Sequence, residues 1–199
     1  LLRMSEEEFD DVIAVNLKGT FACTHFAAQA MREGSHEAAG GGRIVSIVSN
    51  TGLRGGFGQT NYAAAKAGVA GMIRTWALEL TGYAIKVNGL WPVAVTDMTR
   101  VLVDREEQQA ADERRDPKAA HELGLGQIAE VAPMAVYLAS DLCDLQGQIL
   151  TCNGTKLALW SHPDEVVTTE GESWTAESIN DAVTTQFTPF LQSVGMELI

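Results

Sequence analysis

The chain has 199 residues, 46% of them hydrophobic and 20% charged, which suggests one globular domain or two small ones and excludes an intrinsically disordered protein. A net charge of −12 argues against a nucleic-acid partner, because a phosphate backbone binds clustered cations, and no apolar run reaches the ~18–20 residues of a membrane span. Three cysteines without CxxC spacing favour neither a disulfide framework nor a metal site, so we expect a cytoplasmic protein that binds no metal, membrane or nucleic acid.

The first predicted element is a helix. Ser5 and Glu8 have the spacing of a capping box, in which each side chain bonds to the other residue's backbone N–H. Apolar residues then recur at helical spacing from Phe9 to Met31, which predicts one long helix. Because the chain begins so close to this helix, we expect that something upstream of Leu1 has been removed.

Three later runs are typical of strands, and helices are predicted between them. The runs rich in β-branched residues are 43–49, 85–90 and 148–152. The glycines between 52 and 58 predict a loop, and Pro92 is expected to stop the second strand. Helical propensity predicts helices over 62–80, ended by Gly82, and over 128–140. The charged segment 99–126 predicts either a solvated helix pair or a mobile lid. This order implies an α/β fold with a parallel sheet and crossover helices.

Three residues could carry chemistry. Tyr62 and Lys66 are four residues apart, so a helix places both side chains on one face. An ammonium close to a phenol favours the phenolate, and such a tyrosine can act as a general acid or base. Ser49 lies at the carboxyl end of a predicted strand, where ligands of open α/β sheets bind. A Tyr and a Lys at this spacing also occur by chance in many helices, so the pair alone does not establish catalysis.

The sequence around these residues resembles that of the short-chain dehydrogenase/reductase family. Ser49 and the run from Tyr62 to Lys66 resemble the family's Ser and YxxxK motif. Other segments agree in the same order: VNLKGT at 15–20, GRIV at 42–45, GQTN at 58–61, and VN at 87–88 ahead of Pro92. The resemblance spans roughly residues 4–155 and implies a Rossmann-like α/β fold.

The resemblance also implies a function. It implies an NAD- or NADP-dependent oxidoreductase that transfers a hydride between the nicotinamide and a secondary alcohol or ketone. Tyr62 would exchange a proton with the substrate oxygen, and Lys66 would favour the phenolate and bind the nicotinamide ribose. Ser49 would orient the reacting oxygen, and Asn16 would hold a water in a proton relay to Lys66. The residues implied in cofactor binding are Tyr62, Lys66, Pro92, Val93, Ala94 and Thr96.

The loop after the second strand points to one branch of the family. It lacks the usual Gly after Pro92 and has Thr96 at the fourth position after that proline. This form is similar to the dehydrogenase domain of the peroxisomal multifunctional enzyme of β-oxidation, also called 17β-hydroxysteroid dehydrogenase type four. The resemblance implies a 3-hydroxyacyl-CoA or a steroid as substrate. It also implies a homo-oligomer, a dimer or a tetramer, in which the helices of Asn16 and Tyr62 form the interface.

One feature of the family is missing from the sequence. No Gly-rich turn follows a strand, although such a turn would bind the cofactor's pyrophosphate. We therefore expect the amino-terminal half of the fold to be absent, with residues 1–155 forming the carboxyl-terminal portion of a dinucleotide-binding domain and 156–199 an extension of the same domain. The strand that ends near Ser49 would then expose an apolar edge. The chain alone may thus be inactive, and the alternative is a truncated interaction module that binds no cofactor.

Overall fold

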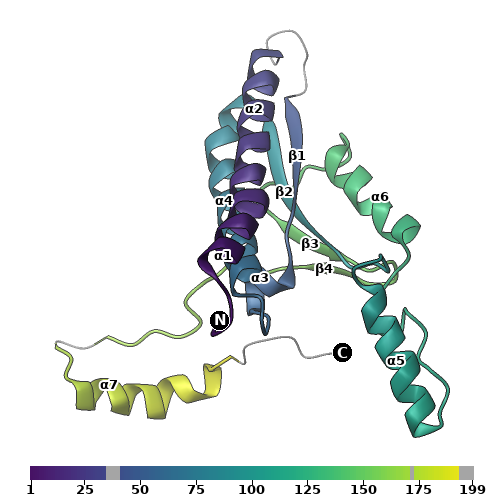
Figure 1. Ribbon diagram of the computed structural model, residues 1–199. Helices are drawn as coiled ribbons and strands as arrows, with labels where there is room; N and C mark the ends of the chain where they lie inside the picture. The colour runs from purple at the N-terminus through teal and green to yellow at the C-terminus, as the bar shows by residue number, and fades with distance from the viewer. Residues whose placement is uncertain (35–40, 171–172, 193–199) are drawn as a thin grey trace. The chain divides into compact units, whose positions relative to one another are not determined.

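The computed structural model describes residues 1–34, 41–170 and 173–192 (Figure 1). The chain divides into two compact units, Leu1–Trp160 and Ser161–Val194. Among the described residues, no helix has both the length and the apolarity needed to cross a bilayer. The second unit consists of α7 (Ala176–Ala182), the π-helical turn η3 (Val183–Phe187) and the 3₁₀ turn η4 (Thr188–Phe190). The assignment of 156–199 to the same domain as 1–155 stays a prediction.

A four-stranded sheet forms the centre of the first unit. Its strands, in spatial order, are β1 (Gly42–Ile47), β2 (Ile85–Pro92), β3 (Ile149–Cys152) and β4 (Leu157–Leu159). The pairs β1–β2 and β2–β3 are parallel, which confirms the three predicted strands and their orientation. The sequence did not predict the fourth strand, β4, which pairs antiparallel with β3 at the end of the parallel part of the sheet. The chain reverses there in a turn, in which Asn153 Oδ1 accepts the Lys156 N–H at 2.7 Å and Gly154 has a φ of 92°.

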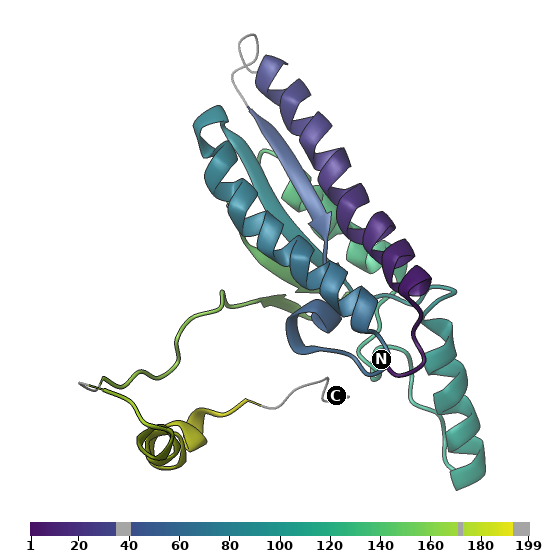
Figure 2. The ribbon, with the colours of Figure 1, turned by 60° about the vertical axis from the view of Figure 1, so that its left-hand side comes forward.

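Helices cover both faces of the sheet (Figures 1 and 2). One face packs against α2 (Gly19–Gly34) and α4 (Thr60–Leu80), with a core that includes Val69, Ile73 and Val87. The other face packs against α6 (Ile128–Ala139), with a core that includes Leu90 and Leu138. Apolar side chains of the sheet therefore pack against helices on both faces, which explains why β2 is buried along most of its length.

The predicted long helix is confirmed in its course and corrected in its detail. It comprises α1 (Glu6–Ile13), the π-helical turn η1 (Ala14–Lys18) and α2, which follow one another directly. The capping box is present, with Ser5 Oγ accepting the Glu8 N–H at 3.1 Å and the Ser5 N–H donating to Glu8 Oε2 at 2.8 Å. The π turn was not predicted, because the hydrophobic pattern hardly changes when one residue is inserted into a helix.

Several predicted boundaries are wrong in instructive ways. Residues predicted as a loop form the short helix α3 (Asn50–Arg54), because Ser49 caps it. Gly82 does not end α4: a 3₁₀ turn, η2 (Thr81–Tyr83), continues the helix, and Ala84 takes the left-handed conformation with a φ of 54°. β2 ends at Pro92, as predicted, but it includes that proline and so runs past the predicted end at 90. The charged segment contains one helix, α5 (Arg100–Glu113), and no second one.

Candidate active site

Ser49 lies where β1 passes into α3. β1 ends at Ile47, and Ser49 is the N-cap of α3 with an extended backbone, φ −149° and ψ 147°. Its Oγ accepts the N–H of Thr51 at 3.2 Å and donates to Asn50 Oδ1 at 3.4 Å. The side chain is buried, and β1 runs parallel to β2, so the hydroxyl lies at the carboxyl edge of the parallel strands, as predicted.

Tyr62 and Lys66 lie in the first two turns of α4. The Nζ atom of Lys66 is 5.5 Å from the centroid of the Tyr62 ring, so the predicted neighbours do meet on one helix face. Lys66 is only 7% exposed, and its Nζ donates to the carbonyl oxygen of Ile47 at 3.1 Å. Burial lowers the pKa of the Lys66 ammonium, because the charged form loses hydration. The result is a buried ammonium between the phenol and the end of β1.

Asn61 fixes the start of the Tyr62 helix. Its Oδ1 accepts the N–H of Tyr62 at 2.8 Å, and its Nδ2 donates to the carbonyl oxygen of Glu8 at 2.8 Å. One side chain therefore ties α1 to the first turn of α4. The sequence analysis missed this role, because Asn61 and Glu8 are 53 residues apart and no local pattern encodes their contact.

Asn16 lies in η1 and bonds within its own helix. Its Nδ2 donates to the Val12 carbonyl at 3.3 Å, and its own carbonyl accepts the hydroxyl of Thr20 at 2.7 Å. η1 packs against α4, the helix of Lys66. Within the described parts of the chain, no hydrogen bond joins Asn16 to Lys66 directly. Its role in a proton relay stays a prediction.

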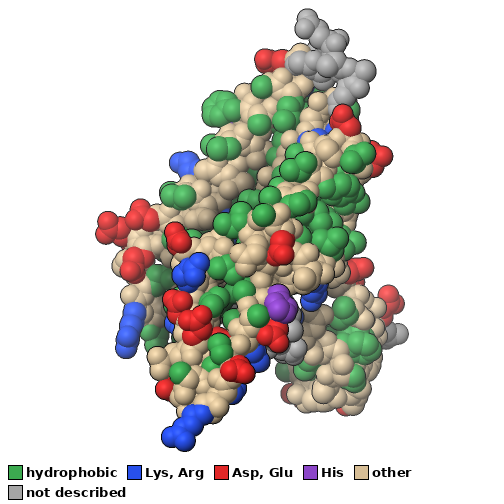
Figure 3. All heavy atoms as spheres, turned by 90° about the vertical axis from the view of Figure 1, so that its right-hand side faces the viewer, with side chains coloured by type: hydrophobic (Ala, Val, Ile, Leu, Met, Phe, Trp, Pro, Cys, Tyr) green, Lys and Arg blue, Asp and Glu red, His purple; other side chains and the backbone are tan. Residues whose placement is uncertain are grey.

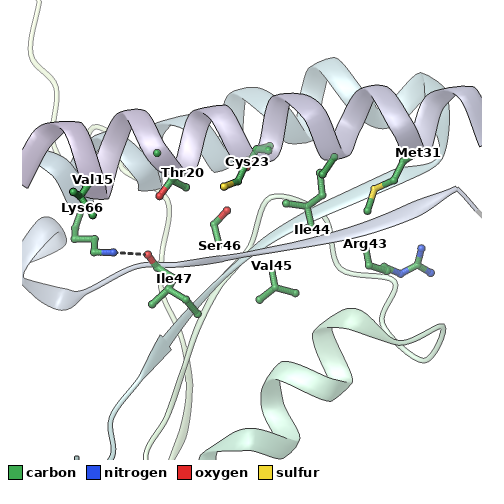
Figure 4. A pocket seen from close by; sticks show the side chains of 13 residues that line it. Val15, Thr20, Cys23, Met31, Arg43, Ile44, Val45, Ser46, Ile47 and Lys66 are labelled. Carbon is green, nitrogen blue, oxygen red and sulfur yellow. Dashed lines mark hydrogen bonds between the residues drawn. The ribbon is translucent and has the colours of Figure 1, made fainter. Parts of the chain in front are cut away.

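A cavity of about 530 Å³ lies between α2 and β1, next to Lys66 (Figure 4). In the close-up, Thr20 and Cys23 project from α2 toward β1, and Ser46 projects from β1 toward α2. The dashed line in Figure 4 marks the Lys66–Ile47 hydrogen bond. The cavity is lined mostly by apolar and small polar side chains, and Lys66 lines it beside Ile47, the last residue of β1. It follows the side of β1 that has no neighbouring strand among the described residues.

The predicted cofactor loop leaves β2 at the same edge of the sheet as Ser49. The Val93 N–H donates to the Cys152 carbonyl at 2.9 Å, and the Val93 carbonyl accepts the Gly126 N–H at 3.1 Å. Thr99, which the sequence analysis did not single out, holds the rest of the loop. Its hydroxyl donates to the Ala94 carbonyl at 2.7 Å and accepts the Thr96 N–H at 2.7 Å. Pro92, Val93, Ala94 and Thr96 thus lie on a braced loop, and their contacts with a cofactor stay predictions.

Metal ligation has no support in the described part of the chain. Residues 1–34, 41–170 and 173–192 contain no group of three or more His, Cys, Asp or Glu side chains arranged to hold an ion. The Tyr62 phenol, the Lys66 ammonium and the Ser49 hydroxyl described above can transfer protons and donate hydrogen bonds.

Comparison with known sequences identifies relatives of this chain. Residues 1–154 match a protein family described as enoyl-(acyl carrier protein) reductase. The chain is 40% identical over 156 residues to the 3-oxoacyl-(acyl-carrier-protein) reductase FabG of Thermotoga maritima, across 77% of this chain and 59% of the relative. It is 41% identical over 143 residues to the (3R)-3-hydroxyacyl-CoA dehydrogenase of Rattus norvegicus, across 71% of this chain and 51% of the relative. The chain thus spans little more than half the length of these curated relatives.

Solved structures agree with the fold. A short chain dehydrogenase from Mycobacterium avium matches 98% of this chain and 61% of its own, with a TM-score of 0.73 and 28% identity. The full-length peroxisomal multifunctional enzyme type 2 from Drosophila melanogaster matches 98% of this chain and 33% of its own, with a TM-score of 0.71. At 24% identity, the second likeness shows the fold alone. The family match over 1–154 and the order Ser49, Tyr62, Lys66 at one sheet edge lead to one conclusion: the chain belongs to the short-chain dehydrogenase/reductase family.

Proposed function

We propose that the protein containing this chain is a nicotinamide-dependent oxidoreductase that interconverts a 3-hydroxyacyl and a 3-oxoacyl thioester. The observation that carries this proposal is the buried Lys66 ammonium, 5.5 Å from the ring centroid of Tyr62, on a helix beside the strand end that bears Ser49. The substrate class is favoured over a steroid because the relatives described above are named for 3-oxoacyl and 3-hydroxyacyl substrates.

In the proposed mechanism, Tyr62 handles the proton. Its hydroxyl donates a proton to the carbonyl oxygen of the substrate during reduction, or accepts one from the hydroxyl during oxidation. The nearby Lys66 ammonium stabilises the phenolate form by electrostatic attraction. Ser49 is held by the Thr51 N–H, and its bond to Asn50 is long at 3.4 Å. The serine hydroxyl can therefore turn to the substrate oxygen and orient it.

The residues present fit the nicotinamide end of NAD or NADP. The Lys66 ammonium has three N–H donors, and Ile47 accepts one of them. The others can bind the ribose hydroxyls, and the loop of Val93, Ala94 and Thr96 can hold the nicotinamide. When bound, the nicotinamide would supply or accept the hydride, and the protein's part is to orient and to move the proton.

We also propose a homo-oligomer, a dimer or a tetramer, in the cytoplasm. α2 and α4 expose large apolar side chains, with Phe21 48%, Phe26 68% and Leu78 82% exposed, and exposed apolar side chains of this kind suit an interaction surface. Hydrophobic side chains also gather on the face seen in Figure 3. Cys23, Cys143 and Cys152 are free thiols, which suits a reducing compartment.

Replacing Tyr62 by Phe tests the proposal. In the complete gene product, assayed with a 3-hydroxyacyl-CoA and each cofactor, Tyr62→Phe is expected to lower kcat by a factor on the order of 10²–10⁴ while the circular dichroism spectrum stays unchanged. The matched control is Tyr83→Phe in η2, whose ring is 44% exposed. Wild-type turnover in Tyr62→Phe would refute the mechanism.

The alternative function is an interaction module that binds no cofactor. The family match and the named relatives favour the oxidoreductase over this alternative. Titration of NADH and NADPH against the complete gene product, followed by fluorescence, separates the two. Saturable binding supports the oxidoreductase, and no binding of either at millimolar concentration supports the module.

A further inference from the structure

Gly52 lies at an unusually close contact between two helices. A Cβ atom added to Gly52 in α3 would lie 2.5 Å from the backbone nitrogen of Ala67 and 2.5 Å from the carbonyl carbon of Lys66 in α4. Real Cβ atoms essentially never approach backbone atoms to less than 3.0 Å. The backbone conformation does not itself require glycine, because Gly52 is absent from the positive-φ positions. The close approach of α3 to α4 is therefore the reason for glycine here.

Both helices at this contact carry residues of the proposed active site. Ser49 caps α3, and its carbonyl accepts the N–H of Gly52 at 3.0 Å. Lys66 is one of the two residues that Gly52 touches, and Tyr62 lies one turn before it. The separation of α3 from α4 thus fixes the position of the Ser49 hydroxyl relative to Tyr62 and Lys66.

We propose that Gly52 is a positioning residue, whose missing side chain lets α3 approach α4 closely enough for Ser49 and Tyr62 to act on one substrate oxygen. This inference rests on the proposed function. A second tie supports it: the hydroxyl of Thr51 donates to Gln59 Oε1 at 3.2 Å, which fastens α3 to the residue before α4. Because the Thr51–Gln59 bond ties α3 to the start of α4, a side chain at Gly52 displaces α3 as one unit. Ser49, which caps α3, moves with it.

Two glycines of α4 show how specific the Gly52 contact is. A Cβ on Gly68 would lie 2.7 Å from Cδ1 of Leu17, the mobile end of a side chain in η1, so Gly68→Ala requires only a side-chain shift. A Cβ on Gly71 would meet nothing within 4 Å. Gly71→Ala is thus the matched control: the same change, in the same sequence region, without the contact.

The test compares Gly52→Ala with Gly71→Ala in the complete gene product. Gly52→Ala is expected to lower kcat by on the order of 10–100-fold, with little change in the KM for the cofactor, because Lys66 stays in place. Gly71→Ala keeps kcat within about twofold. In a Ser49→Ala background, Gly52→Ala is expected to cause no additional loss, since it acts through Ser49. A merely structural role would give a loss of the same size in both backgrounds.

The outcomes separate this inference from the proposed function. Full activity of Gly52→Ala, or a loss that adds to the loss caused by Ser49→Ala, overturns the inference about Gly52. The proposed oxidoreductase function still holds in that case, provided that Tyr62→Phe is inactive. If Tyr62→Phe is fully active, the proposed function fails, and the crystal structure of Gly52→Ala decides: Ser49 Oγ displaced from the Tyr62 hydroxyl supports the positioning role, and an unchanged separation refutes it. If Gly52→Ala does not fold, Thr51→Val takes its place. That variant removes the bond to Gln59 without adding an atom, and the same non-additivity with Ser49→Ala is expected.

Discussion

The Nζ atom of Lys66 donates a hydrogen bond to the carbonyl oxygen of Ile47, 19 residues earlier in the chain, at 3.1 Å. Ile47 is the last residue of β1, which lies at one edge of the sheet. The N–H of Val48 donates to Leu90 of β2. Because the Ile47 C=O and the Val48 N–H belong to one planar trans peptide group and point in opposite directions, the Ile47 carbonyl faces away from β2. The ammonium is thus buried against an edge carbonyl and has no carboxylate partner among the described residues.

Burial of the Lys66 ammonium lowers the stability of the folded chain, because the charge loses hydration. Lys66→Met is therefore expected to raise the free energy of unfolding at pH 7 by about 1 kcal/mol. Burial lowers the Lys66 pKa from its ordinary 10.5, so between the lowered value and 10.5 the unfolded chain binds more protons than the folded one. The stability of the wild type therefore rises with pH in that window, and the advantage of Lys66→Met shrinks. Urea unfolding at a series of pH values up to 10.5 measures both effects.

The control for Lys66→Met is Lys156→Met, because that lysine is exposed on the turn before β4. It is expected to change stability by less than about 0.5 kcal/mol at any pH. An advantage of Lys66→Met that is absent at pH 7, or that stays constant up to high pH, would show that burial of the charge carries no cost.

Asn88 is expected to be a major source of stability. It is 1% exposed in β2, where its Nδ2 donates to the Leu145 carbonyl at 2.8 Å and its Oδ1 accepts the Gln148 N–H at 3.0 Å. Asn88→Ala leaves two backbone groups without partners, and we expect a loss of about 3 kcal/mol in urea unfolding. Asn180→Ala, on the exposed surface of α7, serves as the control. A loss below about 1 kcal/mol at Asn88 would mean that water replaces both bonds.

The sequence predicted what depends on neighbours along the chain. The capping box of Ser5 and Glu8 and the shared helix face of Tyr62 and Lys66 follow from spacings of three and four residues, and both are present. The bond from Asn61 to the Glu8 carbonyl spans 53 residues. No local pattern encodes such a contact, because it arises only when α1 packs on α4.

The same distinction explains the missed elements. The short helix α3 depends on the Ser49 cap and on the bare backbone of Gly52, which lets it pack on α4. Glycines in that segment had indicated a loop, since glycine disfavours an isolated helix. Packing of α3 on α4 provides the stabilisation that the local helix propensity of this segment lacks. The same packing places Ser49, the N-cap of α3, in the candidate site.

Glu106 is expected to hold the segment after α5 in place. Its carboxylate accepts hydrogen bonds from the Arg115 guanidinium and from the Lys118 N–H, the latter at 2.9 Å. Arg115 is the main cause that lowers the Glu106 pKa from 4.5 to about 2. Glu106→Gln is expected to increase hydrogen–deuterium exchange of the segment around Lys118 several-fold at pH 7, whereas Glu107→Gln, on the exposed side of α5, leaves it unchanged.

The pH dependence of this contact follows from the direction of the pKa shift. The folded-state pKa of Glu106 is depressed, so its stabilisation is fully present above 4.5 and is lost as the pH falls toward about 2. After correction for intrinsic exchange rates, protection near Lys118 should be constant from pH 7 down to about 5 and decline below 4.5. A decline that begins between pH 7 and 5 would point to a different titrating group.

Within the ranges that the structure describes, β1 has no strand on one side, and this edge is expected to make the chain self-associate. Ile47 is 46% exposed at that edge, and an exposed apolar edge strand can pair with another chain. Ile47→Glu adds a charge there and is expected to lower the apparent mass of the chain in concentration-dependent light scattering. Leu78→Glu adds the same charge on α4, at a residue that is 82% exposed. If only Leu78→Glu lowers the mass, the chains associate through their helices, as proposed for the homo-oligomer, and not through the strand. If each variant lowers it in part, both surfaces contribute, and the double variant should then be monomeric.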